Sequence, residues 1–324
     1  MDPESFNHCF ALVNGIRMHY VDQGTGPLAV LCVHGFPDLW YGWRFQIPFL
    51  VSLGYRVVVP DMRGYGQTDA THALSGYTAK SITHDLVALL DHLGISTAVW
   101  AGHDWGGMHV WRAALWHPER VLGVISFCTP FSETPKEGAT LERFVQRFPM
   151  WSYQLYFRRF ESVDALDREI PLFLTVLLRS HDEIVETSVM SPRVPVRERT
   201  IADARGTTRS SLLSANELAY YVQQYQRQGM LGPTNYYRVD ELSAREEREA
   251  HIECVVRKPC MMVTVGNDHV LPAEWADGME KRVPRLMRRH IESAGHWVLV
   301  EQKELANAAL RAFLDEITSA EAKL

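Results

Sequence analysis

Residues 97–107 read TAVWAGHDWGG, and this stretch decides the fold of the chain. Its apolar, β-prone first half leads into Gly102 and Gly106, which bracket Asp104. A helical pattern follows, in which apolar residues recur at spacings of three and four (Met108, Trp111 and Leu115). We therefore predict a strand, a sharp turn and a helix, with glycines where a Cβ would collide with the incoming strand or the outgoing helix. Asp104 then projects from the turn as a reactive carboxylate, or else it serves as a helix N-cap.

The segments on either side predict a sheet that is covered on both faces. Residues 10–13 and 17–21 are two short strands joined by Asn14-Gly15, which is a strong hairpin signal. Two apolar runs with a helical pattern between them then show the β-α-β spacing of a parallel sheet. The predicted class is α/β, with a mostly parallel sheet flanked by helices. Besides the strand in residues 97–107, the remaining predictions are strands at 28–33, 56–59, 121–128, 260–265 and 287–291, and helices around 43–50, 82–93 and 305–317.

A long helical insertion interrupts this pattern. Between residues 136 and 245 the strand signal disappears, and aromatic and basic residues recur at helical spacing. We predict one core domain, formed by residues 1–135 and 246–324, with residues 136–245 inserted as a helical cap. Within the insertion, residues 188–209 hold two prolines, a glycine and five arginines, which is more typical of an exposed loop.

The composition excludes several classes of protein. The chain has 324 residues, 46% of them hydrophobic, and its net charge of -6 is spread without a basic stripe, so no nucleic-acid partner is expected. The longest uncharged apolar run, residues 170–178, is far shorter than the roughly 20 residues that span a membrane. Five scattered cysteines without a C-x-x-C pair indicate neither a disulfide framework nor a metal site. Met1-Asp2-Pro3-Glu4 carries acids where a targeting peptide needs bases, so we expect a cytoplasmic protein.

Three further segments fall where chemistry at Asp104 would need them. The backbone N–H groups of Phe36, in a His-Gly-Phe-Pro turn after a predicted strand, and of Trp105 could bind a developing oxyanion. Asp268 and His296 each follow a predicted strand, at the carboxyl edge where ligands bind in open α/β sheets. The order nucleophile, acid, histidine therefore indicates a catalytic triad. The His-Gly-Phe-Pro segment could instead be only a turn, and Asp277 or Glu274 could replace Asp268.

Six motifs along nearly the whole chain resemble the soluble epoxide hydrolases of the α/β-hydrolase superfamily. Most members of that superfamily carry serine where this chain has Asp104. The epoxide hydrolases commonly have tryptophan before their second cap tyrosine, whereas this chain has Tyr236, which makes Tyr237 the aligned residue. The motifs are HGFP at 34–37, GHDWGG at 102–107, TPF at 129–131, SYQLYF at 152–157, NYYR at 235–238 and GHW at 295–297.

The resemblance implies a two-step hydrolysis of an epoxide to a vicinal diol. Asp104 is the nucleophile and forms an ester, since an aspartate, with a reference pKa of about 3.9, is already an anion at neutral pH. Tyr153 and Tyr237, with a reference pKa of about 10, donate to the epoxide oxygen. His296, oriented by Asp268, then activates water. No cofactor or metal is required, and the expected partners are water and an apolar epoxide, bound among Phe36, Trp105, Met108 and Phe131.

The same residues leave alternative functional hypotheses open. A haloalkane dehalogenase also places tryptophan after its nucleophilic aspartate, but it needs halide-binding N–H donors rather than cap tyrosines. A serine esterase lacks its serine here, and a ligand receptor on this fold needs no complete triad. We expect a monomer or a homodimer. The terminal Ala322-Lys323-Leu324 resembles the S-K-L peroxisomal address, which makes peroxisomal residence a second expectation; a solvated helix end is the alternative.

Overall fold

The computed structural model describes residues 1–183 and 204–321. Of the predicted exposed loop at 188–209, residues 188–203 lie outside the described residues, as does the terminal tripeptide Ala322-Lys323-Leu324. Among the described residues, no helix is long and apolar enough to cross a membrane.

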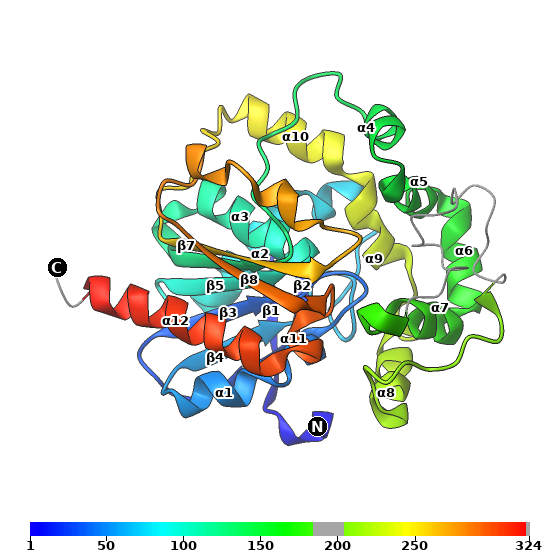
Figure 1. Ribbon diagram of the computed structural model, residues 1–324, viewed down its shortest axis with the longest axis horizontal. Helices are drawn as coiled ribbons and strands as arrows, with labels where there is room; N and C mark the ends of the chain where they lie inside the picture. Colours follow the sequence, from blue (N-terminus) through cyan, green and yellow to red (C-terminus); the bar gives the residue numbers. More distant parts are fainter. Residues whose placement is uncertain (184–203, 322–324) are drawn as a thin grey trace.

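Eight strands form one sheet in the order β1-β2-β4-β3-β5-β6-β7-β8 (Figure 1). The six strands from β4 to β8 are parallel, β2 pairs antiparallel with β4, and β1 forms an antiparallel hairpin with β2. Every residue of β3 and β5 is buried, which explains their continuous apolar runs. The predicted α/β class is confirmed. The strands are β1 His8–Val13, β2 Ile16–Gln23, β3 Ala29–Val33, β4 Arg56–Pro60, β5 Ala98–His103, β6 Val121–Phe127, β7 Cys260–Asn267 and β8 Leu286–Gly295.

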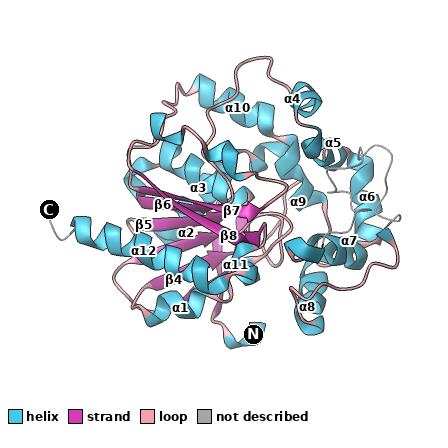
Figure 2. Cartoon of the chain, in the orientation of Figure 1, coloured by secondary structure: helices cyan, strands magenta, loops and turns pink. Residues whose placement is uncertain are grey.

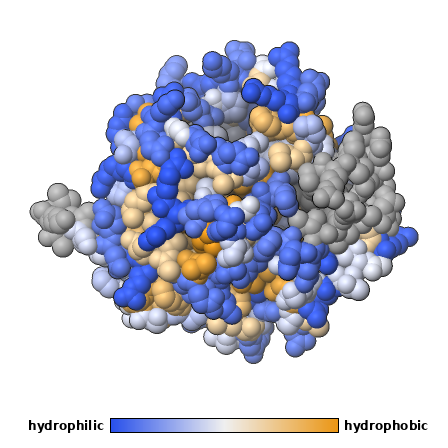
Figure 3. Space-filling view, viewed as in Figure 1, coloured by the Kyte–Doolittle hydropathy of each residue, from blue (hydrophilic) through white to orange (hydrophobic). Residues whose placement is uncertain are grey.

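Helices cover both faces of the sheet (Figure 2). On one face α2 packs against α3 and β1, and α3 packs against β5 and β6. On the other face α12 contacts α1, α11 and β6. Apolar side chains fill the interior, and hydrophilic residues cover most of the face in Figure 3. The bounds are α1 Gln46–Ser52, α2 Ala79–His92, α3 Trp105–Trp116, α11 Val298–Glu301 and α12 Lys303–Glu321.

Between β6 and β7 the described residues are helical or irregular and contain no strand. Most of these helices lie beyond one end of the sheet (Figure 1). Aromatic contacts place them over the carboxyl ends of β3 and β5, since Tyr237 packs on Phe36 and on Trp105. The bounds of a separate cap domain stay a prediction. The helices are α4 Leu141–Arg147, α5 Ser152–Phe157, α6 Phe160–Arg168, α7 Ile170–Leu177, α8 Ala215–Tyr225, α9 Leu231–Asn235 and α10 Asp240–Glu249.

Two predicted elements differ from the observed ones in an informative way. The single helix predicted around residues 43–50 is a 3-10 turn, η2 Trp40–Trp43, followed by α1. Pro48 explains the break, because its ring would clash with the carbonyl of Arg44 in a continuous helix. β8 is longer than predicted and runs to Gly295, so that it ends directly before His296.

Candidate active site

Asp104 stands on a strained turn between β5 and α3. Its backbone has φ +52° and ψ −123°, a conformation that costs an L-residue on the order of 1–3 kcal/mol. Gly102 and Gly106 permit the turn, because a Cβ on Gly102 would meet the carbonyl oxygen of Gly106 and a Cβ on Gly106 would meet that of Val33. Asp104 occupies the N-cap position of α3, yet its side chain makes no capping hydrogen bond. The carboxylate is therefore not used as a cap.

One carboxylate oxygen of Asp104 is held by the loop after β3. The N–H of Phe36 donates to Oδ1 of Asp104 at 2.6 Å. The loop itself is tied down by buried His34, whose Nδ1 bonds the carbonyl of Gly35 and whose Nε2 accepts the N–H of Met62, both at 2.9 Å. Gly35 has to be glycine, since a Cβ there would run into the Asp104 side chain. Phe36 thus presents its N–H where the sequence predicts an oxyanion donor.

A histidine faces the other oxygen of Asp104, and a second carboxylate bonds that histidine from its other side. Nδ1 of His296 donates to Oδ2 of Asp268 at 2.8 Å, while its Nε2 lies 3.8 Å from Oδ2 of Asp104. Oδ1 of Asp268 accepts the N–H groups of Val270 and Leu271 at 2.8 and 3.0 Å. The structure therefore brings the three predicted residues together from the ends of β5, β7 and β8.

The alternative acids do not reach this histidine. Glu274 and Asp277 are exposed, in and directly after the 3-10 turn η10 Ala273–Ala276. Asp268 is 6% exposed and bonds the His296 ring directly. Among the three candidates, the acid beside His296 is Asp268.

The charges of these groups depend on one another. Burial lowers the pKa of His296, but the charge of Asp268, the hydrogen bond to it and the charges of Asp104 and Glu301 raise that pKa to about 9. Burial raises the pKa of Asp268, yet His296 and the N–H groups of Leu271 and Val270 bring it down to about 2. For Asp104, burial raises the pKa more than His296 and the N–H groups of Phe36 and Trp105 lower it. At neutral pH His296 is an imidazolium between two acidic side chains.

Two buried tyrosines belong to the helical segment between β6 and β7, which lies over the centre formed by Asp104, Asp268 and His296. Tyr153 lies in α5, and Tyr237 lies in the 3-10 turn η9 Tyr236–Arg238. Their ring centroids are 6.1 Å apart, and the Tyr237 ring stands at 5.1 Å from the rings of both Phe36 and Trp105. Burial raises the pKa of both hydroxyl groups above the usual tyrosine value. Both hydroxyls therefore stay protonated at neutral pH.

Tyr236 has a different environment from its neighbour. Its hydroxyl donates to the carbonyl of Arg63 at 3.0 Å, and its ring packs on Tyr65 and Tyr77 in the core. Tyr236 therefore anchors the helical segment to the sheet, and Tyr237 is the residue placed against Phe36.

Of the two remaining predicted pocket residues, one lies in α3 and the other packs against it. Met108 is half-buried in the first turn of α3, where its N–H donates to the carbonyl of Asp104 at 3.1 Å. Phe131 is buried against Trp111 and beneath Arg112. Their contact with a substrate stays a prediction.

Two polar residues that the sequence analysis did not single out, His103 and Thr129, bond the backbone of His296 and Asp104. Nε2 of buried His103 bonds the carbonyl of His296 at 2.7 Å, and burial lowers its pKa to about 3, so it is neutral. The hydroxyl of Thr129 donates to the carbonyl of Asp104 at 2.7 Å. Both residues lie inside quoted motifs, but a motif does not state what each member contacts. Potential metal-ligand atoms of His103, Cys128 and His296 lie within 4.8 Å of one another, although Nε2 of His103 and Nδ1 of His296 already make hydrogen bonds.

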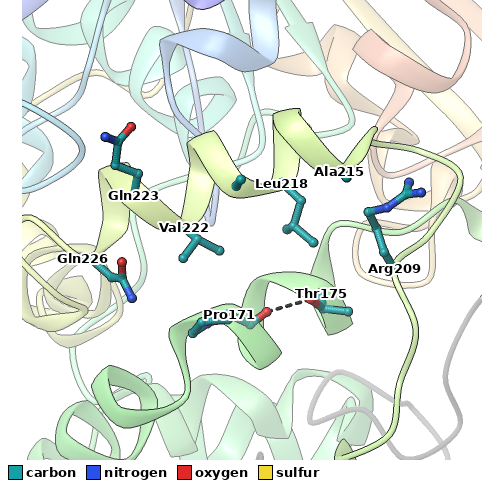
Figure 4. Close-up of a pocket in the computed structure, with 9 residues that line it drawn as sticks. Pro171, Thr175, Arg209, Ala215, Leu218, Val222, Gln223 and Gln226 are labelled. Carbon is teal, nitrogen blue, oxygen red and sulfur yellow. Dashed lines mark hydrogen bonds between the residues drawn. The ribbon is translucent and has the colours of Figure 1, made fainter.

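A surface hollow between α7 and α8 is a separate feature (Figure 4). Apolar Pro171, Leu218 and Val222 line it, and the hydroxyl of Thr175 donates to the carbonyl of Pro171 at 2.7 Å. None of the predicted site residues lines this hollow.

The mostly parallel sheet and the turn that carries Asp104 are typical of the α/β-hydrolase fold. Residues 29–303 match the family described as alpha/beta hydrolase fold. The chain is 35% identical, over 97% of its length, to bifunctional epoxide hydrolase 2 of Sus scrofa, of which it spans 56%. It is 32% identical to an epoxide hydrolase of Neurospora crassa, with 97% of each chain covered. A solved Vigna radiata epoxide hydrolase mutant superimposes with a TM-score of 0.84 at 30% identity, covering 97% of this chain and 99% of that one. The chain belongs to the epoxide hydrolases of the α/β-hydrolase fold.

Proposed function

We propose that this protein hydrolyses lipophilic epoxides to vicinal diols through a covalent ester on Asp104. One observation carries the proposal: the turn bears a carboxylate, with Oδ1 held by the N–H of Phe36 and Oδ2 facing His296. A carboxylate can displace an epoxide oxygen at a tetrahedral carbon without a base, whereas a serine needs one. The membership in the epoxide hydrolases supports the same reaction.

In the first step Oδ2 of Asp104 attacks an epoxide carbon, because Oδ1 is engaged by Phe36. A new carbon–oxygen ester bond forms while the ring carbon–oxygen bond breaks. The leaving oxygen takes a proton from Tyr153 or Tyr237, whose hydroxyls are protonated at neutral pH. The products of this step are a hydroxy ester and a tyrosinate.

Ester formation prepares His296 to act as a base. The ester carries no charge, so His296 loses one of the two carboxylates that flank it, and its pKa falls from about 9. The imidazolium can then give up its proton, which restores the tyrosine hydroxyl. His296 becomes neutral only after the ester exists.

In the second step neutral His296 takes a proton from water, and the hydroxide attacks the ester carbonyl of Asp104. The N–H groups of Phe36 and Trp105 stabilise the oxyanion of the tetrahedral intermediate. Collapse of that intermediate breaks the ester bond, and the leaving alkoxide takes the proton of the hydroxyl that came from water. This gives the diol and regenerates the Asp104 carboxylate beside the His296 imidazolium. Protons balance over the cycle, and the net reaction adds one water to one epoxide.

The surroundings of the centre suggest the class of substrate. We assign residues 136–245 the role of a cap on a core of residues 1–135 and 246–324, because Tyr153 and Tyr237 come from that segment. Phe36, Trp105, Met108 and Phe131 would line an apolar pocket for a lipophilic epoxide. The tyrosine pair, together with the epoxide hydrolase relatives, argues against the haloalkane dehalogenase alternative.

A single turnover in water labelled with heavy oxygen tests the mechanism. We expect the first diol to carry an unlabelled oxygen from Asp104 and the Asp104 peptide to gain the label, as measured by mass spectrometry. Solvent oxygen in the first diol together with an unlabelled Asp104 would show direct hydration instead. Halide release from a haloalkane serves as the control reaction and is expected to be absent.

A further inference from the structure

A buried glutamate adjoins the segment that carries His296. Glu301 is the last residue of α11, and its side chain is 4% exposed. Its Oε2 accepts the N–H of Gly295 at 2.9 Å and lies 2.6 Å from Nδ1 of His181. Gly295 directly precedes His296, so the Glu301 carboxylate holds the backbone next to His296.

The packing around Gly295 is too close for any other residue. A Cβ on Gly295 would lie 2.5 Å from Cβ of His181 and 3.0 Å from Oε1 of Glu301. Oε1 is buried and has no hydrogen-bond partner among the described residues. The charge on a buried oxygen without a hydrogen-bond donor beside it is poorly screened. The negative potential therefore acts on the nearby imidazolium.

Several ionisable groups face His296 from the elements around it. Asp104 comes from the turn after β5, Asp268 from the loop after β7 and Glu301 from α11. Neutral His103 and the Cys128 thiol contact the backbone carbonyl of His296. The charge of Glu301 contributes to the raised pKa of His296. Once Asp104 is esterified, Asp268 and Glu301 are the acidic residues that remain beside His296 in the described part of the chain.

We propose that Glu301 is a positioning residue for His296, which fixes the backbone at Gly295 and keeps the imidazole basic after the charge of Asp104 has been consumed. His181, which the helical segment contributes, holds the carboxylate in place. This inference rests on the proposed function only for the ester step; the effect of Glu301 on the His296 titration does not depend on it.

The variant Glu301→Gln separates charge from shape, because its amide oxygen can still accept the N–H of Gly295. We expect the His296 pKa, followed by imidazole NMR, to fall by about one pH unit. His296→Gln identifies the resonance. The acid limb of ester hydrolysis should move to lower pH by the same amount. Glu304→Gln removes an exposed glutamate three residues further on and should change neither measurement.

Glu301→Asp keeps the charge, so the His296 pKa should return most of the way to its value in the unaltered protein. His181→Asn should shift the His296 titration when Glu301 is present and leave it unchanged in the Glu301→Gln background. A His296 titration that is identical in the unaltered protein and in folded Glu301→Gln would overturn the proposal. The NMR result needs no turnover, so absent diol formation in the unaltered protein would count against the proposed function alone.

Discussion

At the scale of single residues, the chemistry depends on which groups keep or lose a proton. Asp104, Asp268 and His296 form a chain in which each proton position affects the next. The tyrosine hydroxyls lie outside that chain, in surroundings that keep them neutral. The proposed acid and base functions are thereby divided between the helical segment and the sheet.

Replacement of the two tyrosines tests this separation. Tyr153→Phe and Tyr237→Phe should each slow ester formation by about 10²-fold, because each change removes one of the two proposed proton donors to the epoxide oxygen. The double variant should nearly abolish it. Stopped-flow measurement of ester formation checks both results, and Tyr236→Phe is a matched control because its hydroxyl bonds Arg63. Full diol production by the double variant would refute the donor assignment.

At the scale of secondary-structure elements, one arginine joins the two segments that carry the tyrosines. Arg158 caps the end of α5, and its Nε donates to the carbonyl of Tyr237 at 2.7 Å. It also pairs with Asp240 at the start of α10. The distance between the Tyr153 and Tyr237 rings therefore depends on this side chain.

Arg158→Met should loosen that connection without touching the triad. We expect ester formation to slow about tenfold, since small displacements of positioned groups reduce rates strongly, while hydrolysis of the ester stays unchanged. Arg159→Met alters a neighbouring exposed arginine and should leave both steps unaffected. Equal slowing of both steps by Arg158→Met would point to a general loss of structure.

At the scale of the whole molecule, hydrogen bonds attach the helical segment to the sheet on several sides of the centre. The indole N–H of Trp151 donates to the carbonyl of Val270 at 2.9 Å, near Asp268. The indole N–H of Trp297, beside His296, donates to the carbonyl of Leu177 at 2.8 Å. The segment thus contacts the loops that carry Asp268 and His296, which couples its position to theirs.

The buried His296–Asp268 pair should also make the stability of the fold depend on pH. The pKa of His296 is raised from 6.5 to about 9, so its contribution is full below pH 6.5 and is lost as the pH rises through 9. The pKa of Asp268 is lowered from 3.8 to about 2, so its contribution is present above pH 3.8 and is lost as the pH falls through 2. The pair should stabilise most between about pH 4 and 6.5.

Denaturant unfolding between pH 6 and 10 measures this dependence. The free energy of unfolding should decline above pH 6.5, and His296→Gln should remove most of that decline. His290→Gln, at an exposed histidine of β8, should leave the decline in place. A decline of the same size in His296→Gln would assign the effect to other groups.

The sequence by itself determined the features that depend on short-range sterics and periodicity. The turn at Asp104 needs its glycines because the strand and the helix meet there, and the apolar runs of β3 and β5 follow from burial on both faces. The tertiary structure decided which distant groups meet. Separate loops converge at one edge of the sheet. This convergence places Asp268 rather than Glu274 or Asp277 beside His296, and Tyr237 rather than Tyr236 beside Phe36. It also brings Glu301 into contact with Gly295 and His181. No local pattern records such convergence, because the partners join through packing and not through spacing along the chain.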